Sequence, residues 1–191
     1  MQYLPAINNI LFWVLATLLI IDAYFVIFHG GIPNIRTAPA IRKKIIELLK
    51  EDFEAKKKSN YTIVDVGSGN GLFTREIARA LPDAKVVGIE LARQSVFWSN
   101  CLKRIMGLTN LEYRRMNFLS FHFGEADAVT MYLLPSVMVL LGKKLNEEAR
   151  PDTLITSNKF PLGDGWEPQQ VLDVNTLYIH QKKLFIYRKK L

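Results

Sequence analysis

The stretch that decides the fold is Tyr61–Gly71, which reads YTIVDVGSGNG. Its first half is an apolar run rich in β-branched residues, with the length of a buried strand, and a helical pattern follows directly at residues 72–81. Gly67, Gly69 and Gly71 separate the two and let the backbone turn sharply and approach a ligand closely. The first turn of the helix offers free amide donors. The stretch therefore predicts a strand, a glycine-rich turn and a helix that together bind a ligand.

Strand and helix patterns alternate on the C-terminal side of this stretch. Buried strands are predicted at residues 84–90, 111–117, 126–133 and 152–158, and helices at 91–106 and 135–149. The last two strand patterns, 176–181 and 183–190, have no helix between them and predict a hairpin. Strands that alternate with helices form βαβ units, in which the strands run parallel. We therefore expect an α/β fold: a Rossmann-like, doubly wound sheet, mostly parallel, with a C-terminal antiparallel hairpin.

Polar residues follow the first three strands of this pattern where each strand ends. Asp65, in the first, suits a ligand that carries an ammonium group. Glu90 ends the second strand, about 20 residues after the glycine turn, where an acid can accept hydrogen bonds from two ribose hydroxyls. Asn117 and Phe118 follow the third, where they can read the edge of an adenine and cover its face. Because the carboxyl ends of parallel strands meet at one edge of a sheet, we expect one nucleotide-binding site there.

A second group of residues follows the fourth and fifth strands. The fourth strand runs into YLLP at residues 132–135, and the fifth runs into SNKFPLGDGWEP at residues 157–168. The candidates in these two segments are Tyr132, Asn158, Phe160 and Trp166. A loop with aromatic residues, prolines and glycines beside a strand edge is poorly explained as core. We expect a second substrate to approach the bound ligand here.

The N-terminal part of the chain contains one long apolar run, Ile7–Phe28. As a helix it would be about 33 Å long, enough to cross a bilayer. A cleaved signal peptide fits less well because residues 1–9 contain no Lys or Arg, and a core helix fits less well because residues 10–21 are apolar on all sides. We therefore predict one transmembrane helix. Asp22 would face a partner helix or the headgroups, or act as a functional intramembrane acid.

Basic residues begin on the C-terminal side of this run, with Arg36, Arg42, Lys43 and Lys44. The positive-inside rule therefore predicts a single-pass protein whose main domain faces the cytoplasm or the mitochondrial matrix. The predicted organisation is an anchor at residues 1–30, a linker and amphipathic helix at 31–58, and the α/β domain at 59–191.

The composition agrees with this division. The chain has 191 residues, a net charge of +7 and 49% hydrophobic residues, with a mean hydropathy of +0.08. A chain this basic is normally hydrophilic, so its apolar residues must be concentrated in one segment. The 11 Phe residues and the 23% charged content exclude a disordered chain. A single cysteine, Cys101, cannot form an internal disulfide, which agrees with a reducing compartment.

The glycine turn with Asp65, the acid Glu90 and the pair Asn117–Phe118 resemble the class I, seven-β-strand, S-adenosylmethionine-dependent methyltransferases. The YLLP element, the SNxFPLGDGW loop and the apolar N-terminal run look like the membrane-anchored protein-lysine methyltransferases related to the mitochondrial enzymes that modify the ATP synthase c subunit and the adenine nucleotide translocase. The resemblance implies S-adenosylmethionine as the cofactor. In that family a Pro-containing stretch closes over the cofactor, and its shortened match here is Thr37-Ala38-Pro39.

The resemblance also implies the acceptor, which would be a lysine ε-amine of an integral-membrane protein. Tyr132 would position the amine or accept its proton, and Asn158, Phe160 and Trp166 would line a lysine channel. Packing of the loop is the alternative role for Tyr132 and Trp166.

Other functions remain open at this point. The acceptor could be RNA or a lipid-like small molecule, and a Rossmann-like domain could also serve a non-catalytic membrane adaptor. The basic residues are spread over helix ends and the C-terminal tail, which suits anionic membrane lipid at least as well as nucleic acid. His29, His122 and His180 lack Cys or acidic neighbours at ligand spacing, so no metal site is expected.

Overall fold

The computed structural model describes residues 9, 12–17, 19–20, 36–163, 165–178 and 181–190. The chain divides into two units, residues 1–35 and 36–191. The described residues of the first unit are helical, and the rest of the predicted transmembrane segment lies outside the described residues. No helix within the described ranges is both long enough and apolar enough to cross a membrane.

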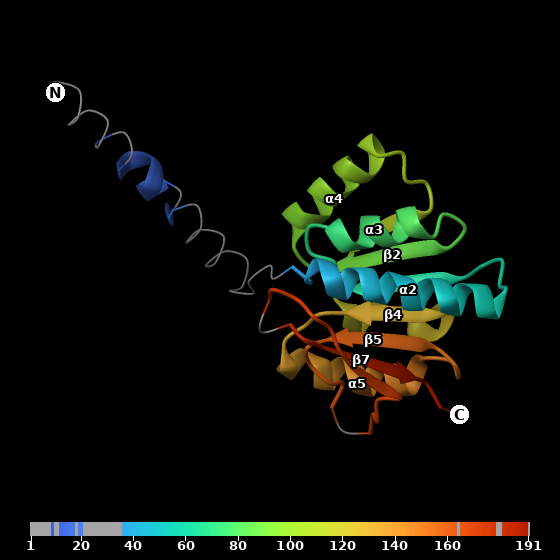
Figure 1. Cartoon of the computed structure of the whole chain (residues 1–191). Helices are drawn as coiled ribbons and strands as arrows, with labels where there is room; N and C mark the ends of the chain where they lie inside the picture. The colour runs from blue at the N-terminus through green and yellow to red at the C-terminus, as the bar shows by residue number, and fades with distance from the viewer. Residues whose placement is uncertain are drawn as a thin grey trace. The chain divides into compact units, whose positions relative to one another are not determined.

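The second unit is built on a seven-stranded sheet with the order β3-β2-β1-β4-β5-β7-β6 (Figure 1). The first five strands are β1 (Thr62–Val66), β2 (Lys85–Glu90), β3 (Leu111–Arg115), β4 (Ala128–Met131) and β5 (Leu154–Asn158). They run parallel, so their carboxyl ends meet at one edge. The last two strands are β6 (Gln170–Asp173) and β7 (Lys183–Arg188). β7 is antiparallel to both of its neighbours, β5 and β6.

The C-terminal hairpin exists, but the predicted position of its first strand was wrong. The strand that pairs with β7 is β6, with Asp173 opposite Lys183, whereas residues 176–181 were expected. Within that expected strand, residues 176–178 are irregular and Gln181 is completely buried, with its side chain in a hydrogen-bond network described below. Apolar alternation suggested a strand, but the side-chain bonds of Gln181 and the pairing of β6 decided the structure.

Helices cover both faces of the sheet, as the doubly wound prediction required (Figure 1). α2 (Pro39–Lys56), α3 (Leu72–Ala80) and α4 (Arg93–Ile105) contribute to the core on one face. α5 (Pro135–Glu148) and two short 3-10 helices, η1 (Phe118–Ser120) and η2 (Phe123–Glu125), lie on the other face. The two cores lie on opposite sides of the sheet because successive residues of each strand point to opposite faces.

A buried carboxylate fastens α2 to the sheet. Ile41, Ile45 and Leu49 form the apolar stripe of α2 at helical spacing, and Asp52 continues this stripe one turn later. Asp52 accepts a hydrogen bond from the hydroxyl of Tyr61. The Oδ1 of Asp52 lies 2.5 Å from Nη1 of Arg188 in β7, and its Oδ2 lies 3.3 Å from Nζ of Lys56. The buried charge of Asp52 therefore has hydrogen-bond and ion-pair partners. These contacts fix the position of α2 on the sheet, and residues 36–38 lead directly into this helix.

Replacing Tyr61 by Phe should lower the free energy of unfolding by about 1 to 3 kcal/mol, because the phenol is the buried donor to Asp52. Urea titration of the full chain measures this change. The matched control is Lys44→Ala, which breaks a half-exposed ion pair with Glu47 on the same helix and should cost less than about 1 kcal/mol. Equal stability of Tyr61→Phe and the wild type would show that Asp52 does not fasten the helix.

Candidate functional site

The glycine turn after β1 has the geometry that the sequence predicts. Gly67, Gly69 and Gly71 all have positive φ, at 75°, 53° and 70°. A Cβ on Gly67 would lie 2.5 Å from a methyl group of Leu133, and one on Gly71 would overlap the hydroxyl of Tyr113. Both the backbone conformation and the close packing therefore require glycine here.

Asp65 is a buried acid beside this turn. Thr74, in the first turn of α3, donates a hydrogen bond of 2.6 Å to one of its oxygens. Burial, together with the negative charge of Glu90, raises the pKa of Asp65 to about 6, although the hydrogen bond from Thr74 opposes the shift. No described Lys, Arg or His forms an ion pair with this carboxylate. A cationic group bound here would relieve the unfavourable charge.

Glu90 connects the glycine turn to the start of α4. One carboxylate oxygen accepts the backbone N–H of Gly69 at 2.8 Å. The other accepts those of Leu91 and Ala92, at 2.7 and 2.8 Å. A carboxylate has about four acceptor positions, so one stays open for a ligand hydroxyl. The acid is therefore held in place before any ligand binds.

The adenine-side pair lies at the end of β3. Asn117 is exposed, and its side-chain oxygen accepts the N–H of Leu119 at 3.0 Å, which caps η1. Phe118 is half-buried and packs against the core on the α5 side. The N–H of Met116 donates to the carbonyl of Glu90, so this segment begins next to the acid. Recognition of adenine by Asn117 and Phe118 stays a prediction.

The structure brings the ends of β4 and β5 together. The rings of Tyr132 and Phe160 stack with centroids 6.5 Å apart, and the ammonium of Lys159 lies 4.7 Å from the Phe160 ring centroid. Lys159 has a φ of 70°, which is unfavourable for a residue other than glycine, and such conformations concentrate at functional sites. Burial raises the pKa of the Tyr132 phenol. Tyr132 therefore stays protonated at neutral pH and suits the positioning role better than that of proton acceptor.

Asn158, the last residue of β5, carries an unused acceptor. It is 1% exposed, and its Nδ2 donates to Oε1 of Gln181 at 3.1 Å. Its Oδ1 has no hydrogen-bond partner among the described residues. A buried acceptor without a partner is unfavourable, so a donor from outside the described residues would complete its hydrogen bonding.

Gln181 is a positioning residue that the sequence analysis missed. Its Oε1 also accepts the N–H of Ala38 at 2.8 Å, and its Nε2 donates to the carbonyl of Arg36 at 3.0 Å. Backbone groups cannot exchange donor and acceptor, so they fix the orientation of the Gln181 amide. Gln181 in turn fixes Asn158 with its oxygen unpaired. No sequence signal marked Gln181, because its partners are 143 and 23 residues away along the chain.

The same bonds place Thr37, the predicted cofactor-closing residue, between the two backbone groups that Gln181 holds. The carbonyl of Thr37 accepts a bond of 2.6 Å from Nη1 of Arg42. Arg42 also forms an ion pair of 2.7 Å with Glu76 of α3. The segment is therefore attached to the loop before β7 and to the helix behind the glycine turn.

Trp166 has the packing role that the sequence left open. Its indole N–H donates to the carbonyl of Gly142 in α5 at 2.9 Å, and its ring meets Tyr187 edge to face at 5.8 Å. The hydroxyl of Tyr187 accepts the N–H of Leu162. These contacts fasten the loop after β5 to α5 and β7, and nothing in them assigns Trp166 to a substrate channel.

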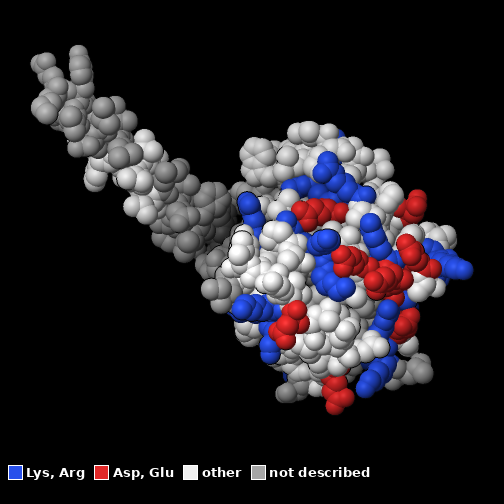
Figure 2. Space-filling view, viewed as in Figure 1, with Lys and Arg blue, Asp and Glu red and all other residues white. Residues whose placement is uncertain are grey.

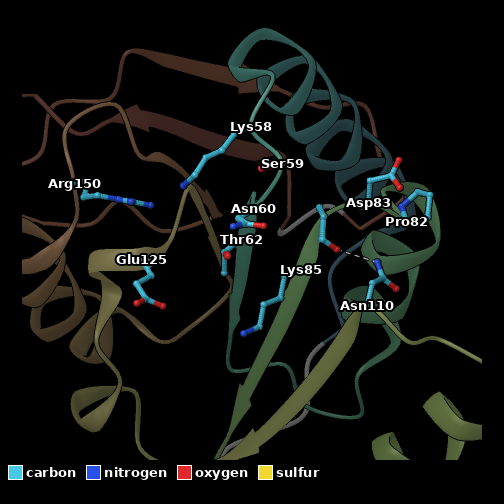
Figure 3. A pocket seen from close by; sticks show the side chains of 11 residues that line it. Lys58, Ser59, Asn60, Thr62, Pro82, Asp83, Lys85, Asn110, Glu125 and Arg150 are labelled. Carbon is cyan, nitrogen blue, oxygen red and sulfur yellow. Dashed lines mark hydrogen bonds between the residues drawn. The ribbon is translucent and has the colours of Figure 1, made fainter.

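A cleft of about 630 Å³ lies at the opposite edge of the sheet (Figure 3). Thr62, Lys85 and Asn110 line it, and they stand at or just before the amino ends of β1, β2 and β3. Lys58 and Arg150 point toward one another because both bind Asp127. These two basic groups therefore serve the fold, and the cleft, at the amino ends of the strands, is not the nucleotide site. Within the described ranges no three His, Cys, Asp or Glu side chains are placed to hold a metal ion.

Three comparisons extend these observations. The family model described as the ANTKMT methyltransferase domain matches residues 65–170. A protein-lysine N-methyltransferase of Saccharolobus islandicus (strain REY15A) is 26% identical over 156 residues, which cover 78% of this chain and 92% of the relative.

Two solved methyltransferase structures share the fold of this chain. An RNA methyltransferase from Salinibacter ruber, in complex with S-adenosyl-L-homocysteine, superposes with a TM-score of 0.67 and 26% identity, covering 82% of this chain and 94% of its own. A SAM-dependent methyltransferase from Aquifex aeolicus gives a TM-score of 0.57 at 15% identity, covering 80% and 99%, and shares the fold.

The residues at the carboxyl edge fit S-adenosylmethionine. Asp65 would supply a negative charge for the ammonium group, and Glu90 would keep an acceptor position for a ribose hydroxyl. The glycine turn allows close approach of the backbone, and Asn117 and Phe118 stay the predicted adenine contacts.

Replacing Asp65 by Asn should stabilise the free protein and weaken the cofactor complex. The pKa of Asp65 is raised in the folded state, so ionisation opposes folding, increasingly from about pH 4 to pH 6 and fully above that range. Asn keeps the bond from Thr74 without the charge, so the gain in unfolding free energy should be about 2 to 3 kcal/mol at pH 8 and small near pH 4. Affinity for S-adenosylmethionine should fall about tenfold or more.

Thermal unfolding from pH 4 to 8 and calorimetric titration of the cofactor check both parts. Asp83→Asn, on the loop before β2, is the control and should change neither. A gain in stability that is the same at every pH, or an unchanged cofactor affinity, would contradict the assignment.

Replacing Gln181 by Leu should lower the maximal rate of methyl transfer about tenfold or more, because the Asn158 amide loses its fixed orientation. Gln181→Glu keeps the acceptor for Ala38 and Asn158 but loses the donor to the Arg36 carbonyl, and should restore part of the rate. Rates are measured with radiolabelled S-adenosylmethionine and host membranes, below the unfolding temperature of each variant. Gln169→Leu is the exposed control. If the Glu variant is as slow as the Leu variant although both are folded, Gln181 does not act by orienting Asn158.

Proposed function

The chain belongs to the ANTKMT methyltransferase domain family, and from this premise we propose that it methylates a lysine ε-amine of a membrane-associated protein. It is an S-adenosylmethionine-dependent methyltransferase. The observation that carries the lysine assignment is the unpaired oxygen of buried Asn158, beside the loop that places Phe160 on Tyr132. The protein-lysine N-methyltransferase of Saccharolobus islandicus supports it independently.

Methyl transfer to lysine requires the neutral form of the amine, which has a free lone pair. A lysine with a pKa of about 10.4 is mostly protonated at pH 7, and its reactive form lies about 4.6 kcal/mol higher in free energy. A buried site lowers the pKa of an amine because burial disfavours the charged form. When bound, S-adenosylmethionine supplies a methyl group on a sulfonium, which is transferred by in-line displacement.

The residues of this chain would orient the amine for that displacement. Oδ1 of Asn158 accepts one N–H of the amine, which fixes the direction of the lone pair. The aromatic rings of Tyr132 and Phe160 border the alkyl chain of the lysine. The neutral phenol of Tyr132 can accept or donate a hydrogen bond without carrying charge.

The membrane part of the proposal rests on the sequence. Ile7–Phe28 is long and apolar enough to cross a bilayer, and the first basic residues follow it. We therefore place the catalytic domain on the cytoplasmic or matrix side, next to membrane lipid. An enzyme attached to the same membrane as its substrate works at a raised effective concentration, which favours an integral-membrane substrate.

RNA is the second candidate acceptor. The net charge of +7 and the structural similarity to the RNA methyltransferase of Salinibacter ruber favour it. Lysine is the stronger candidate because buried Asn158 and the stacked pair Tyr132–Phe160 follow the neighbouring strands β4 and β5, and their groups suit an amine and its alkyl chain. A small-molecule acceptor has no separate observation in its favour, and membership of a methyltransferase family speaks against a non-catalytic adaptor.

The full chain, incubated with radiolabelled S-adenosylmethionine and membranes from cells that lack its gene, should label a membrane protein on lysine. Mass spectrometry of wild-type and deletion membranes identifies the site. Asn158→Ala should reduce the maximal rate at saturating cofactor about tenfold or more, because it removes the amine acceptor together with the donor to Gln181. Glu90→Ala should lose the cofactor instead. Label that enters RNA, or enters no protein, would overturn the lysine assignment.

A further inference from the structure

The outer face of α4 is apolar and exposed. Phe97, Trp98, Leu102 and Ile105, called here the α4 face, have exposed fractions of 60%, 63%, 39% and 80%. Trp98, Leu102 and Ile105 follow one another at spacings of four and three residues, so they share one side of the helix. The opposite side of the helix provides Val96 and Ser99, which are buried. The α4 face is therefore not needed for the packing of the sheet.

The charges within the α4 segment are of one sign. Residues 91–106 contain Arg93, Lys103 and Arg104 and no Asp or Glu. In the view of Figure 2, the α4 region at the top of the domain shows uncharged atoms bordered by Lys and Arg. On the neighbouring strand β3, Glu112 is paired with Arg114, although its charge also interacts with Lys103. An anionic surface would therefore complement the α4 face.

An amphipathic helix with Trp, Phe and Leu on one side and Lys or Arg beside them is the type that lies in the interface of a bilayer. A Trp ring prefers the headgroup level, because its body is apolar and its N–H is polar. Long basic side chains can reach anionic headgroups while their stems stay among apolar groups. In Figure 1, α4 lies beyond α3 at the upper end of the domain.

We propose that the α4 face inserts into the interfacial layer of an anionic lipid bilayer and so orients the catalytic domain on the membrane. The occupant is the lipid surface itself. The inference rests on the membrane association put forward above. Because α4 begins at the two amides that Glu90 holds, the docked helix places the cofactor edge of the sheet in a defined relation to the membrane.

Spin-label accessibility in the reconstituted full chain tests the proposal. Cys101→Ser removes the native thiol, Ile105→Cys places a label on the α4 face, and Lys143→Cys places a matched label on the exposed side of α5, across the sheet. In vesicles of phosphatidylcholine with about 30% phosphatidylglycerol, the label at 105 should collide with a water-soluble nickel complex about fivefold less than the label at 143. The label at 105 should collide correspondingly more with oxygen.

Charge variants complete the test. Lys103→Gln with Arg104→Gln should raise nickel access at position 105 toward the value at position 143, because the attraction to anionic headgroups is lost. Equal nickel access at the two labels in the protein that keeps Lys103 and Arg104 would overturn the proposal. Protection at 105 that appears only when a substrate protein is added, and not with lipid alone, would also overturn it and assign the face to a protein partner.

The measurement separates this inference from the proposed function. Protection of the label at 105 together with methylation of RNA would keep the docking face and remove the lysine assignment. Lysine methylation together with an unprotected label would keep the lysine assignment and remove the docking face. Failure of the full chain to remain with the vesicles on flotation would remove the membrane association on which the docking rests.

Discussion

Two carboxylates at the ends of neighbouring strands set the constraint on which the rest of the site depends. Asp65 is buried without a basic partner among the described residues, and the negative charge of Glu90 helps to raise its pKa to about 6. Such an arrangement opposes folding at neutral pH, so the fold must hold both acids by other means. Thr74 does so for Asp65, and three backbone amides do so for Glu90. The unfavourable charge is the counterpart of a cationic ligand, and S-adenosylmethionine carries both an ammonium and a sulfonium.

A second constraint runs through hydrogen-bond polarity. The backbone at residues 36 and 38 determines which end of the Gln181 amide donates, and Gln181 determines which end of Asn158 remains unpaired. The amide that we assign to the acceptor amine is thus oriented by groups whose polarity cannot change. The position of α2 matters for the same reason, since Asp52 and its partners hold the helix that begins at this segment.

The sequence predicted the features that depend on local patterns of residues. The strand, turn and helix at 61–81 and the four later strands follow from hydrophobic periodicity and from glycines whose positive φ the structure confirms. The first strand of the hairpin was misplaced because β6 is mostly exposed and carries little apolar pattern, whereas residues 176–181 alternate although 176–178 are irregular. Gln181 could not be found, because its role depends on partners that only the fold brings together. For Trp166 the sequence allowed two roles, and the contact with Gly142 supports the packing one.

The way the loop after β5 is held limits how the enzyme can choose its substrate. Trp166 and Leu162 fasten the loop to α5 and β7, and Ser157 donates to the carbonyl of Phe160 at 2.6 Å. These bonds hold Phe160 beside Tyr132 in one arrangement, which on the proposed function would select the acceptor side chain by its shape. A site that selects in this way reads a single side chain and little of the surrounding protein. Selection among proteins must then come from where the domain is held, and the α4 face and the apolar N-terminal run are the features of the chain suited to that task.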